Sequence, residues 1–435
     1  MSIGPDDTRP DDARPFGSRP LGSRPGITRA QCEALDAADP LAGFRADFTL
    51  PEKGVYLDGN SLGALPVRTA ERVREVVEEE WGRELIRSWN DAGWFEQPYR
   101  LGGRIAPLVG AAAGQVVVCD TTSVNLFKVL AAALRLRPGR QTVLGDGAAF
   151  PTDLYIAEGV TSLVGGARSV LLPSTGAEEL ERHLDGDVAA VVLSHVDYRT
   201  GELLDMAAIT AQVRAAGALM IWDVCHSVGA LPVELDACGA DFAVGCTYKY
   251  LNGGPGSPAF LYVAERHQGA AEQPLSGWFG HARPFAFEPA YAPTDGIGRF
   301  LTSSPSLLGQ AALGAALDVW ERADLRAVRA KSLALTDLFI ALVEPLDGIE
   351  VVTPREHHRR GSQVALRHRD GYPVVQALIE RGVIGDFRAP DLMRFGFTPL
   401  YVSYAQVWDA AQQLAEVLES GEWHEERFNR RGAVT

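Results

Sequence analysis

The chain has 435 residues and a mass of 46.8 kDa, which predicts two or three domains and a core that needs neither disulfides nor structural metals. Its 41 basic and 56 acidic side chains give a net charge of −15, which argues against nucleic acid or an anionic membrane as partner. No apolar run approaches the roughly 18 residues of a membrane span, no signal peptide is evident, and five cysteines form no C-x-x-C pair. We therefore expect a cytoplasmic protein.

The N-terminal 29 residues are rich in Pro, Arg, Asp, Gly and Ser, which predicts a disordered leader. Prolines recur every five residues from Pro5 to Pro25, so a proline-rich ligand for a partner domain is the alternative interpretation. We expect residues 30–60 to pack near the C-terminal domain. A large domain over 61–308, a small domain over 309–425 and a tail over 426–435 complete the expected organisation.

From residue 114 onward, short apolar runs alternate with amphipathic stretches. Near-continuous apolar strands separated by helices predict an α/β fold, with a mostly parallel sheet covered on both faces. Strands are expected at Gln115–Asp120, Thr142–Asp146, Ser169–Leu172, Val188–Val196, Ala218–Asp223, Asp241–Cys246 and Ala259–Val263, and helices at Asn125–Leu136 and Ala207–Ala216. Ligands of such sheets bind beyond the carboxyl ends of the strands, which is where chemistry should lie.

A second pattern begins after Pro305 and predicts a smaller α+β domain. A helical pattern runs from about Leu307 to Val343, with a break near Ala323–Asp324. Strands are then expected at Ile349–Val352 and Gln363–Arg367, and helices at Tyr372–Arg381 and Gln406–Ser420.

Two charged residues follow neighbouring predicted strands of the large domain. Asp223 ends one strand, and Lys249 follows the next strand 26 residues later, just before the glycine-rich turn Leu251–Gly256. The other three lysines lie in a turn or on helices. Thr121–Ser123 begin a helix, where hydroxyls and free backbone N–H groups suit a phosphate.

Pyridoxal phosphate (PLP) needs all three features: a lysine for a Schiff base, an anion that keeps its ring nitrogen protonated, and an anion site for its phosphate. Each feature alone has a simpler interpretation. The aspartate could be a turn residue, the lysine a solvated charge, and the hydroxyls a helix cap. Their combination favours PLP.

Other motifs suggest other chemistry. Gly59–Gly63 matches the G-x-S-x-G elbow of serine hydrolases, which would make Ser61 a nucleophile, but Pro66 follows closely and the main sheet comes later. Asn252–Gly256 lacks the spacing of a dinucleotide-binding loop. No third ligand accompanies His357–His358, so we predict no metal site.

From about residue 30 to 420, the chain resembles the kynureninase family of PLP enzymes, which have the aspartate-aminotransferase fold. The resemblance rests on Tyr56–Gly63 (YLDGNSLG), Thr121–Phe127 (TTSVNLF), Phe150–Asp153 (FPTD), Ser194–Val196, Tyr198–Gly201, Trp222–His226 (WDVCH), Gly277–His281 (GWFGH) and, most strongly, Cys246–Gly256 (CTYKYLNGGPG). It implies fold type I, with a large domain built on a mixed, mostly parallel sheet and a smaller α+β C-terminal domain. It also reassigns Gly59–Gly63 to a substrate-side loop.

The resemblance implies roles for individual residues. Lys249 would carry the cofactor covalently and move the proton at the substrate Cα, Asp223 would pair with the ring nitrogen, and Tyr248 would relay protons. Cofactor contacts are implied for Thr122, Ser123, Phe150, Asp153, Ser194, His226 and Tyr248, and, across a dimer interface, for Trp278 and Ser304. Substrate contacts are implied for Arg394, at the α-carboxylate, and for Asn60, Ser61, Trp94, Phe279 and His281. Ser303–Ser306 departs from the Gly-Thr-Pro-Pro or Asn-Pro-Pro that relatives often have.

The implied activity is hydrolysis of the Cβ–Cγ bond of L-kynurenine or 3-hydroxykynurenine, giving anthranilate or 3-hydroxyanthranilate and L-alanine. Such a homodimeric enzyme would serve tryptophan catabolism or NAD biosynthesis. The alternatives are another class V PLP enzyme, an aminotransferase or a desulfurase-like lyase, and a serine hydrolase using Ser61. A desulfurase needs a mobile catalytic cysteine, and all five cysteines lie at or before Cys246.

Overall fold

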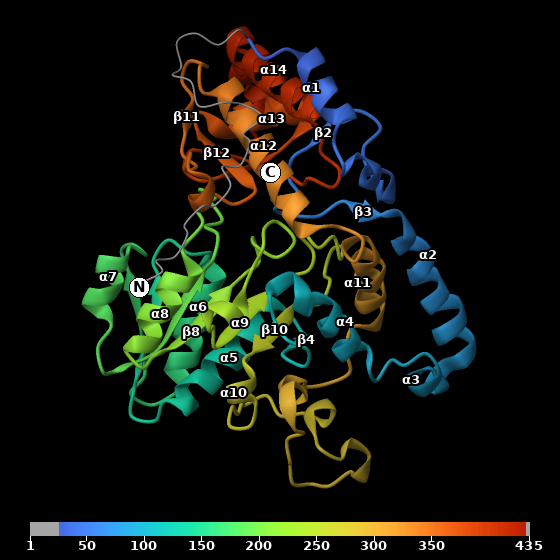
Figure 1. Cartoon of the computed structure of the whole chain (residues 1–435), viewed down its shortest axis with the longest axis vertical. Helices are drawn as coiled ribbons and strands as arrows, with labels where there is room; N and C mark the ends of the chain where they lie inside the picture. The colour runs from blue at the N-terminus through green and yellow to red at the C-terminus, as the bar shows by residue number, and fades with distance from the viewer. Residues whose placement is uncertain (1–25, 432–435) are drawn as a thin grey trace, which may run out of the picture.

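The computed structural model describes residues 26–431, so the predicted leader up to residue 25 and the last four residues of the predicted tail lie outside the described residues. Figure 1 shows a large domain in the lower half of the view and a smaller one above it. None of the helices within residues 26–431 is both long and apolar enough to cross a membrane.

A seven-stranded sheet forms the centre of the large domain, in the order β4-β10-β9-β8-β7-β5-β6. Its strands are β4 (Val116–Val118), β5 (Thr142–Asp146), β6 (Arg168–Leu172), β7 (Val188–Ser194), β8 (Leu219–Asp223), β9 (Phe242–Gly245) and β10 (Phe260–Val263). β10 runs antiparallel to both of its neighbours, and the remaining pairs are parallel. All seven predicted strands are confirmed, with ends that differ by at most two residues.

Side-chain alternation along the strands makes two apolar layers. On β8, Leu219 and Ile221 join the cluster that packs on helix α5 (Thr122–Leu136), whereas Met220 and Trp222 face the cluster that includes helix α8 (Met206–Ala215). Successive strand residues point to opposite faces, so a wholly apolar strand requires helices on both sides. The other helices of this domain are α3 (Ser88–Asp91), α4 (Gln97–Ile105), α6 (Pro151–Leu163), α7 (Ala177–His183), α9 (Leu235–Cys238) and α10 (Glu265–Gln268).

The small domain has a four-stranded antiparallel sheet in the order β11-β12-β15-β14. Its strands are β11 (Glu350–Val351), β12 (Gln363–Arg367), β14 (Asp386–Arg388) and β15 (Leu392–Gly396), and its helices are α12 (Leu325–Val343), α13 (Gly371–Glu380) and α14 (Tyr404–Ser420). The preceding helix, α11 (Leu307–Trp320), packs on α4 of the large domain. The predicted helix break is confirmed, because the Asp324 side chain caps α12 by accepting from the Arg326 N–H. β14 and β15 were missed because buried charges at Asp386 and Arg394 interrupt their apolar pattern.

The segment before the main sheet lies against the small domain. Helix α1 (Arg29–Ala37) contacts α14, where Asp36 accepts from the Tyr404 N–H, and strand β2 (Val55–Tyr56) pairs in parallel with β13 (Val383–Ile384). A further short pair joins β1 (Phe48–Thr49) to β3 (Leu65–Pro66). The loop that follows β2, Gly59–Gly63, is therefore held next to the small domain.

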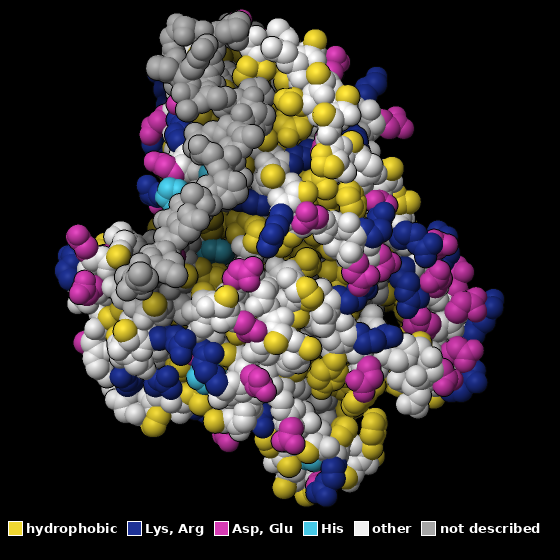
Figure 2. Space-filling view, viewed as in Figure 1, with side chains coloured by type: hydrophobic (Ala, Val, Ile, Leu, Met, Phe, Trp, Pro, Cys, Tyr) yellow, Lys and Arg dark blue, Asp and Glu magenta, His cyan; other side chains and the backbone are white. Residues whose placement is uncertain are grey.

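Two segments project from the body in Figure 1. Helix α2 (Val67–Glu75) continues as a π-helix (Val76–Glu84) along one edge, where Figure 2 shows interspersed acidic and basic side chains. Residues 274–300, called the arm below, contain the 3-10 turns Trp278–Gly280, Pro284–Ala286 and Gly296–Phe300 and form the lower end of the molecule.

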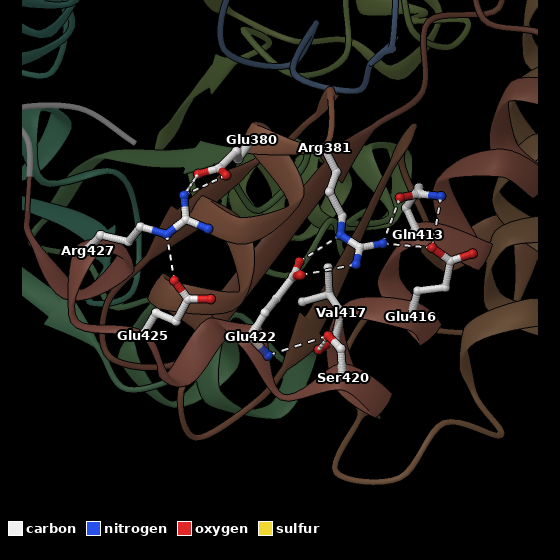
Figure 3. Close-up of polar contacts among 9 residues, drawn as sticks. All are labelled: Glu380, Arg381, Gln413, Glu416, Val417, Ser420, Glu422, Glu425 and Arg427. Atoms are coloured by element: carbon white, nitrogen blue, oxygen red, sulfur yellow. Dashed lines mark hydrogen bonds and ion pairs between the residues drawn. The ribbon is translucent and has the colours of Figure 1, made fainter.

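Arginine–glutamate contacts tie the C-terminal segment to the small domain (Figure 3). Arg381, just after α13, donates to Glu416 on α14 and to Glu422 beyond it. Arg427 holds both carboxylate oxygens of Glu380 at 2.6 and 2.7 Å. The Arg381 and Glu422 side chains are about a quarter exposed and the other three about half exposed, so each pair lies near the surface and contributes about 0–1 kcal/mol.

Candidate active site

The predicted strand-end residues meet at one edge of the large sheet. Ser194, the last residue of β7, lies opposite Asp223, the last residue of β8. Lys249 follows β9, the next strand along. Carboxyl ends of parallel strands share an edge, which is why residues far apart in the chain gather here.

Lys249 contacts a histidine from the neighbouring strand end. Its Nζ lies 2.8 Å from Nε2 of His226 and 5.8 Å from the ring centre of Tyr248. His226 is buried, and burial together with the positive charges of Lys249 and Arg394 lowers its pKa well below the usual value. A neutral imidazole therefore faces the lysine.

Two carboxyl groups lie together beside this lysine. Asp223 accepts a hydrogen bond of 2.7 Å from the backbone N–H of Cys225, and Asp153 approaches from the first turn of α6. Burial and the charge of Asp223 raise the pKa of Asp153. Asp153 therefore holds its proton more readily than a solvated carboxyl group, and in its protonated form it can donate to Asp223.

The start of α5 brings hydroxyl groups to the same edge. Thr121 caps the helix by accepting from the Val124 N–H at 3.3 Å, and the Thr122 hydroxyl lies 3.7 Å from the Cys225 sulfur. The preceding residue, Asp120, has a positive φ of 46° and is held by the buried Lys128. Thr122 and Ser123 are half-buried at a helix start, an arrangement that suits an anion.

Ion-paired arginines lie nearby, in the small domain. Arg394 is 1% exposed, and its Nε donates to Asp386 at 2.7 Å while its Nη2 reaches the second carboxylate oxygen. Arg388 also lies 2.8 Å from Asp386. The Arg394 fork, predicted to bind a substrate carboxylate in two-point fashion, is thus already closed on Asp386.

The Gly59–Gly63 loop supplies two further groups here. Ser61 donates to Asp386 at 2.8 Å and accepts from Arg394 at 3.1 Å. Asn60 is fully buried and donates to Gln363 at 3.4 Å. A hydrolase nucleophile needs a base to take its proton, and the partners of Ser61 are a carboxylate and an arginine, not a histidine, so the elbow interpretation is not favoured.

Three residues that were predicted to contact substrate or cofactor, Trp94, Phe279 and Trp278, lie in a separate aromatic cluster. Phe279 packs on Phe95 with ring centres 4.8 Å apart, Trp94 packs on Trp89 at 6.0 Å, and Trp278 also packs on Trp89, at 5.8 Å. Within residues 26–431, no hydrogen bond or ring contact joins this cluster to Lys249 or Asp223. Trp278 and His281 line a cavity of about 770 Å³ at the base of the arm.

Two remaining predicted residues are exposed. Phe150, at the start of α6, is 47% exposed and meets the Tyr198 ring edge-on, with centres 5.3 Å apart. Ser304 lines a cavity of about 250 Å³ together with Asp120 and Thr121 of its own chain. Both are accessible to a ligand at this edge.

Comparison with known proteins shows which family this chain is similar to. Residues 328–414 match the family described as "Kynureninase C-terminal domain". Kynureninases from Pseudomonas fluorescens and from Burkholderia pseudomallei (strain 1106a) are each 52% identical over 415 residues, covering 94% of this chain and 100% of theirs. This chain belongs to the kynureninase family.

Solved structures agree with the fold expected of a kynureninase. An apo cysteine desulfurase from Thermococcus onnurineus NA1 aligns with a TM-score of 0.74 at 18% identity, covering 87% of this chain and 98% of that one. The cysteine desulfurase CsdA from Escherichia coli aligns with a TM-score of 0.73 at 20% identity, with the same coverage. The predicted fold type I architecture is therefore confirmed.

Sequence reasoning about this chain missed three residues of the candidate site: Gln363, Asp386 and Arg388. Gln363 lies in a correctly predicted strand, but nothing in its local pattern distinguishes it from a packed polar residue. Asp386 and Arg388 lie on either side of Phe387, an alternation of polar and apolar residues that is typical of an edge strand. Three residues are too few for this alternation to predict a strand.

Proposed function

We propose that this kynureninase-family chain hydrolyses the Cβ–Cγ bond of L-kynurenine, or of its 3-hydroxy form, to anthranilate, or 3-hydroxyanthranilate, and L-alanine. The family membership supports this activity. The observation that carries it is the meeting of Lys249, Asp223 and the start of α5 at one sheet edge, with a pair of arginines beside them.

The donor set fits pyridoxal phosphate. When bound, this cofactor supplies a ring that accepts electrons from the substrate Cα. Lys249 would hold it covalently, Asp223 would keep its ring nitrogen protonated, and Phe150 is exposed enough to lie on the ring. Thr122, Ser123 and Ser194 would bind the phosphate and ring substituents, and His226, 2.8 Å from the Lys249 Nζ, would support the ring.

Proton transfer falls to two neighbouring residues. Lys249, once displaced by the substrate amine, would take the Cα proton. Burial raises the pKa of Tyr248, so its hydroxyl stays protonated and can donate during the later steps. Water adds to the γ-carbonyl, the Cβ–Cγ bond breaks, and anthranilate leaves before L-alanine.

The α-carboxylate of the substrate would bind to two arginines. Of the five N–H bonds of Arg394, four have partners: two on Asp386, one on Ser61 and one on the Tyr198 carbonyl. Arg388 shares Asp386 and is 34% exposed. Asp386 balances the charge of one arginine, so the three groups together keep one net positive charge. That charge matches a single substrate carboxylate. Arg388 would therefore supply the hydrogen bonds to the carboxylate that Arg394, already paired, does not.

A homodimer would complete the site. The arm carries the exposed side chains Phe285 and Phe287, 68% and 86% exposed, and Ile86 nearby is 77% exposed. Figure 2 shows apolar side chains gathered at this lower end. Exposed apolar patches of this kind typically mark an interface, and a second copy covering it would bring Trp278 toward the neighbouring site.

Anthranilate fluorescence tests the activity directly. The PLP-loaded protein is mixed with L-kynurenine and, separately, with the 3-hydroxy form, and Lys249→Ala serves as the inactive control. We expect anthranilate and an equal amount of alanine from the unaltered chain. A shift of the cofactor absorption band without either product would contradict the proposal and indicate transamination or another substrate.

A further inference from the structure

Gln363 is a buried glutamine whose amide orientation is determined by its neighbours. It is 0% exposed, and its Nε2 donates to the backbone carbonyls of Tyr198 at 3.0 Å and Asp197 at 3.3 Å. Carbonyl oxygens only accept, so the NH₂ group must face them. The amide oxygen Oε1 is therefore directed to the opposite side.

That oxygen faces the histidine beside the reactive lysine. Oε1 lies 3.2 Å from Nδ1 of His226 and also accepts from Nδ2 of Asn60 at 3.4 Å. Because Oε1 has no hydrogen to donate, Nδ1 must carry one. A neutral imidazole has a single N–H, so the other nitrogen, Nε2, carries a lone pair.

The lone pair of His226 faces Lys249. Nε2 lies 2.8 Å from the Lys249 Nζ, and the burial that keeps this imidazole neutral keeps Nε2 free of a proton. An amine or ammonium group can only donate to such a nitrogen. The chain of contacts thus runs from β12 of the small domain, through His226, to the lysine of the large domain.

We infer that Gln363 is a positioning residue: it holds His226 in its Nδ1–H tautomer, so that Nε2 accepts a hydrogen bond from Lys249 and orients the lysine nitrogen. The inference rests on the proposed function only in taking Lys249 as the residue that bonds the cofactor. With the opposite tautomer, an N–H group would face the lysine, and Nε2 could not accept a hydrogen bond from it. A merely space-filling Gln363 would leave the tautomer without a preference.

The tautomer can be measured directly. The full-length protein, labelled with ¹⁵N-histidine and stripped of cofactor, is examined by NMR at pH 8. Among the signals of its nine histidines, that of His226 is identified as the one that disappears in His226→Gln. We expect a neutral His226 with the proton on Nδ1 and an Nε2 shift typical of an unprotonated nitrogen. A proton on Nε2 would overturn the inference, with no variant of Gln363 required.

Variants of Gln363 add a second readout. Gln363→Leu should lose the tautomer preference and slow covalent attachment of added PLP by about tenfold, the effect of roughly one hydrogen bond. Gln363→Glu should keep the proton on Nδ1 but stabilise the imidazolium, so that His226 titrates at higher pH. Gln376→Leu on α13, a half-buried glutamine outside the site, should match the unaltered chain in both measurements.

The outcomes separate this inference from the proposed activity. An unchanged tautomer and attachment rate in Gln363→Leu would overturn the inference even if anthranilate forms. Absence of anthranilate, together with the expected tautomer and slowed attachment, would overturn the substrate assignment and leave the role of Gln363 intact.

Discussion

Asp386 and Arg394 lie directly opposite each other on the antiparallel strands β14 and β15, and the arginine fork holds both oxygens of the carboxylate. Both side chains are almost fully buried, at 1% and 2% exposure. The pair therefore determines how Arg394, the arginine proposed to bind the substrate carboxylate, is oriented and how much of its charge remains available.

Removing one partner of this pair should destabilise the protein. Asp386→Asn leaves the buried Arg394 without its carboxylate, which should lower the free energy of unfolding by about 3–5 kcal/mol, and also deprives the partly exposed Arg388 of its partner. Glu380→Gln breaks the exposed pair with Arg427 and should cost about 0–1 kcal/mol. Urea unfolding measures both, and equal losses would contradict the burial argument.

Arg388→Gln should weaken substrate binding more than catalysis. We expect KM for L-kynurenine to rise about tenfold or more, because hydrogen bonds to charged groups contribute roughly 1.5–3 kcal/mol, while kcat changes little. Arg369→Gln removes an arginine whose side chain is 83% exposed and serves as control. Inhibition by a decarboxylated kynurenine analogue should not change in Arg388→Gln; an equal loss there would rule out a carboxylate contact.

Asp58 should make the stability depend on pH. Burial and the negative charge of Asp386 raise its pKa from 3.8 to about 7. Between these values the folded state binds more protons than the unfolded state, so the free energy of unfolding falls as pH rises from about 4 to 7, by at most about 1.4 kcal/mol per pH unit. Asp58→Asn should remove this component. If the free energies of unfolding of the unaltered chain and of Asp58→Asn changed in parallel between about pH 4 and 7, Asp58 would not titrate in that range.

Asp223→Asn should nearly abolish turnover without loss of fold. An amide cannot provide the negative charge that keeps the cofactor ring protonated, and we expect kcat/KM to fall by about a hundredfold or more. Asp205→Asn is the matched control, since Asp205 caps α8 and asparagine caps equally well. Near-normal anthranilate production by Asp223→Asn would refute the role assigned to this carboxylate.

Phe287→Asp should shift the protein from dimer to monomer. The side chain is 86% exposed on the arm, and a carboxylate there would be costly to bury against a second copy. Leu163→Asp alters a side chain that is 74% exposed at the end of α6, outside the Phe285–Phe287 patch, and should not change the mass measured by light scattering. A monomeric unaltered protein, or a dimeric Phe287→Asp, would count against this interface.

Local chemistry in the sequence was enough to predict the central sheet and its reactive edge. Apolar runs of four to nine residues predict the buried strands of this sheet, and parallel strands bring their carboxyl ends together whatever the details of packing. Asp223, Lys249 and Thr122 could therefore be assigned to one site from their positions after strands or at the start of a helix.

The partners of these residues depended on tertiary structure. Gln363 is separated by 137 residues from His226, and Tyr198 by 196 from Arg394, so no periodicity connects them. Buried polar groups must find partners, but which partner each one finds depends on how the two domains pack. The sequence thus determined which side chains are available for the proposed chemistry, and only the packed fold decided that Asp386 occupies the Arg394 fork and that Gln363 lies against His226 beside Lys249.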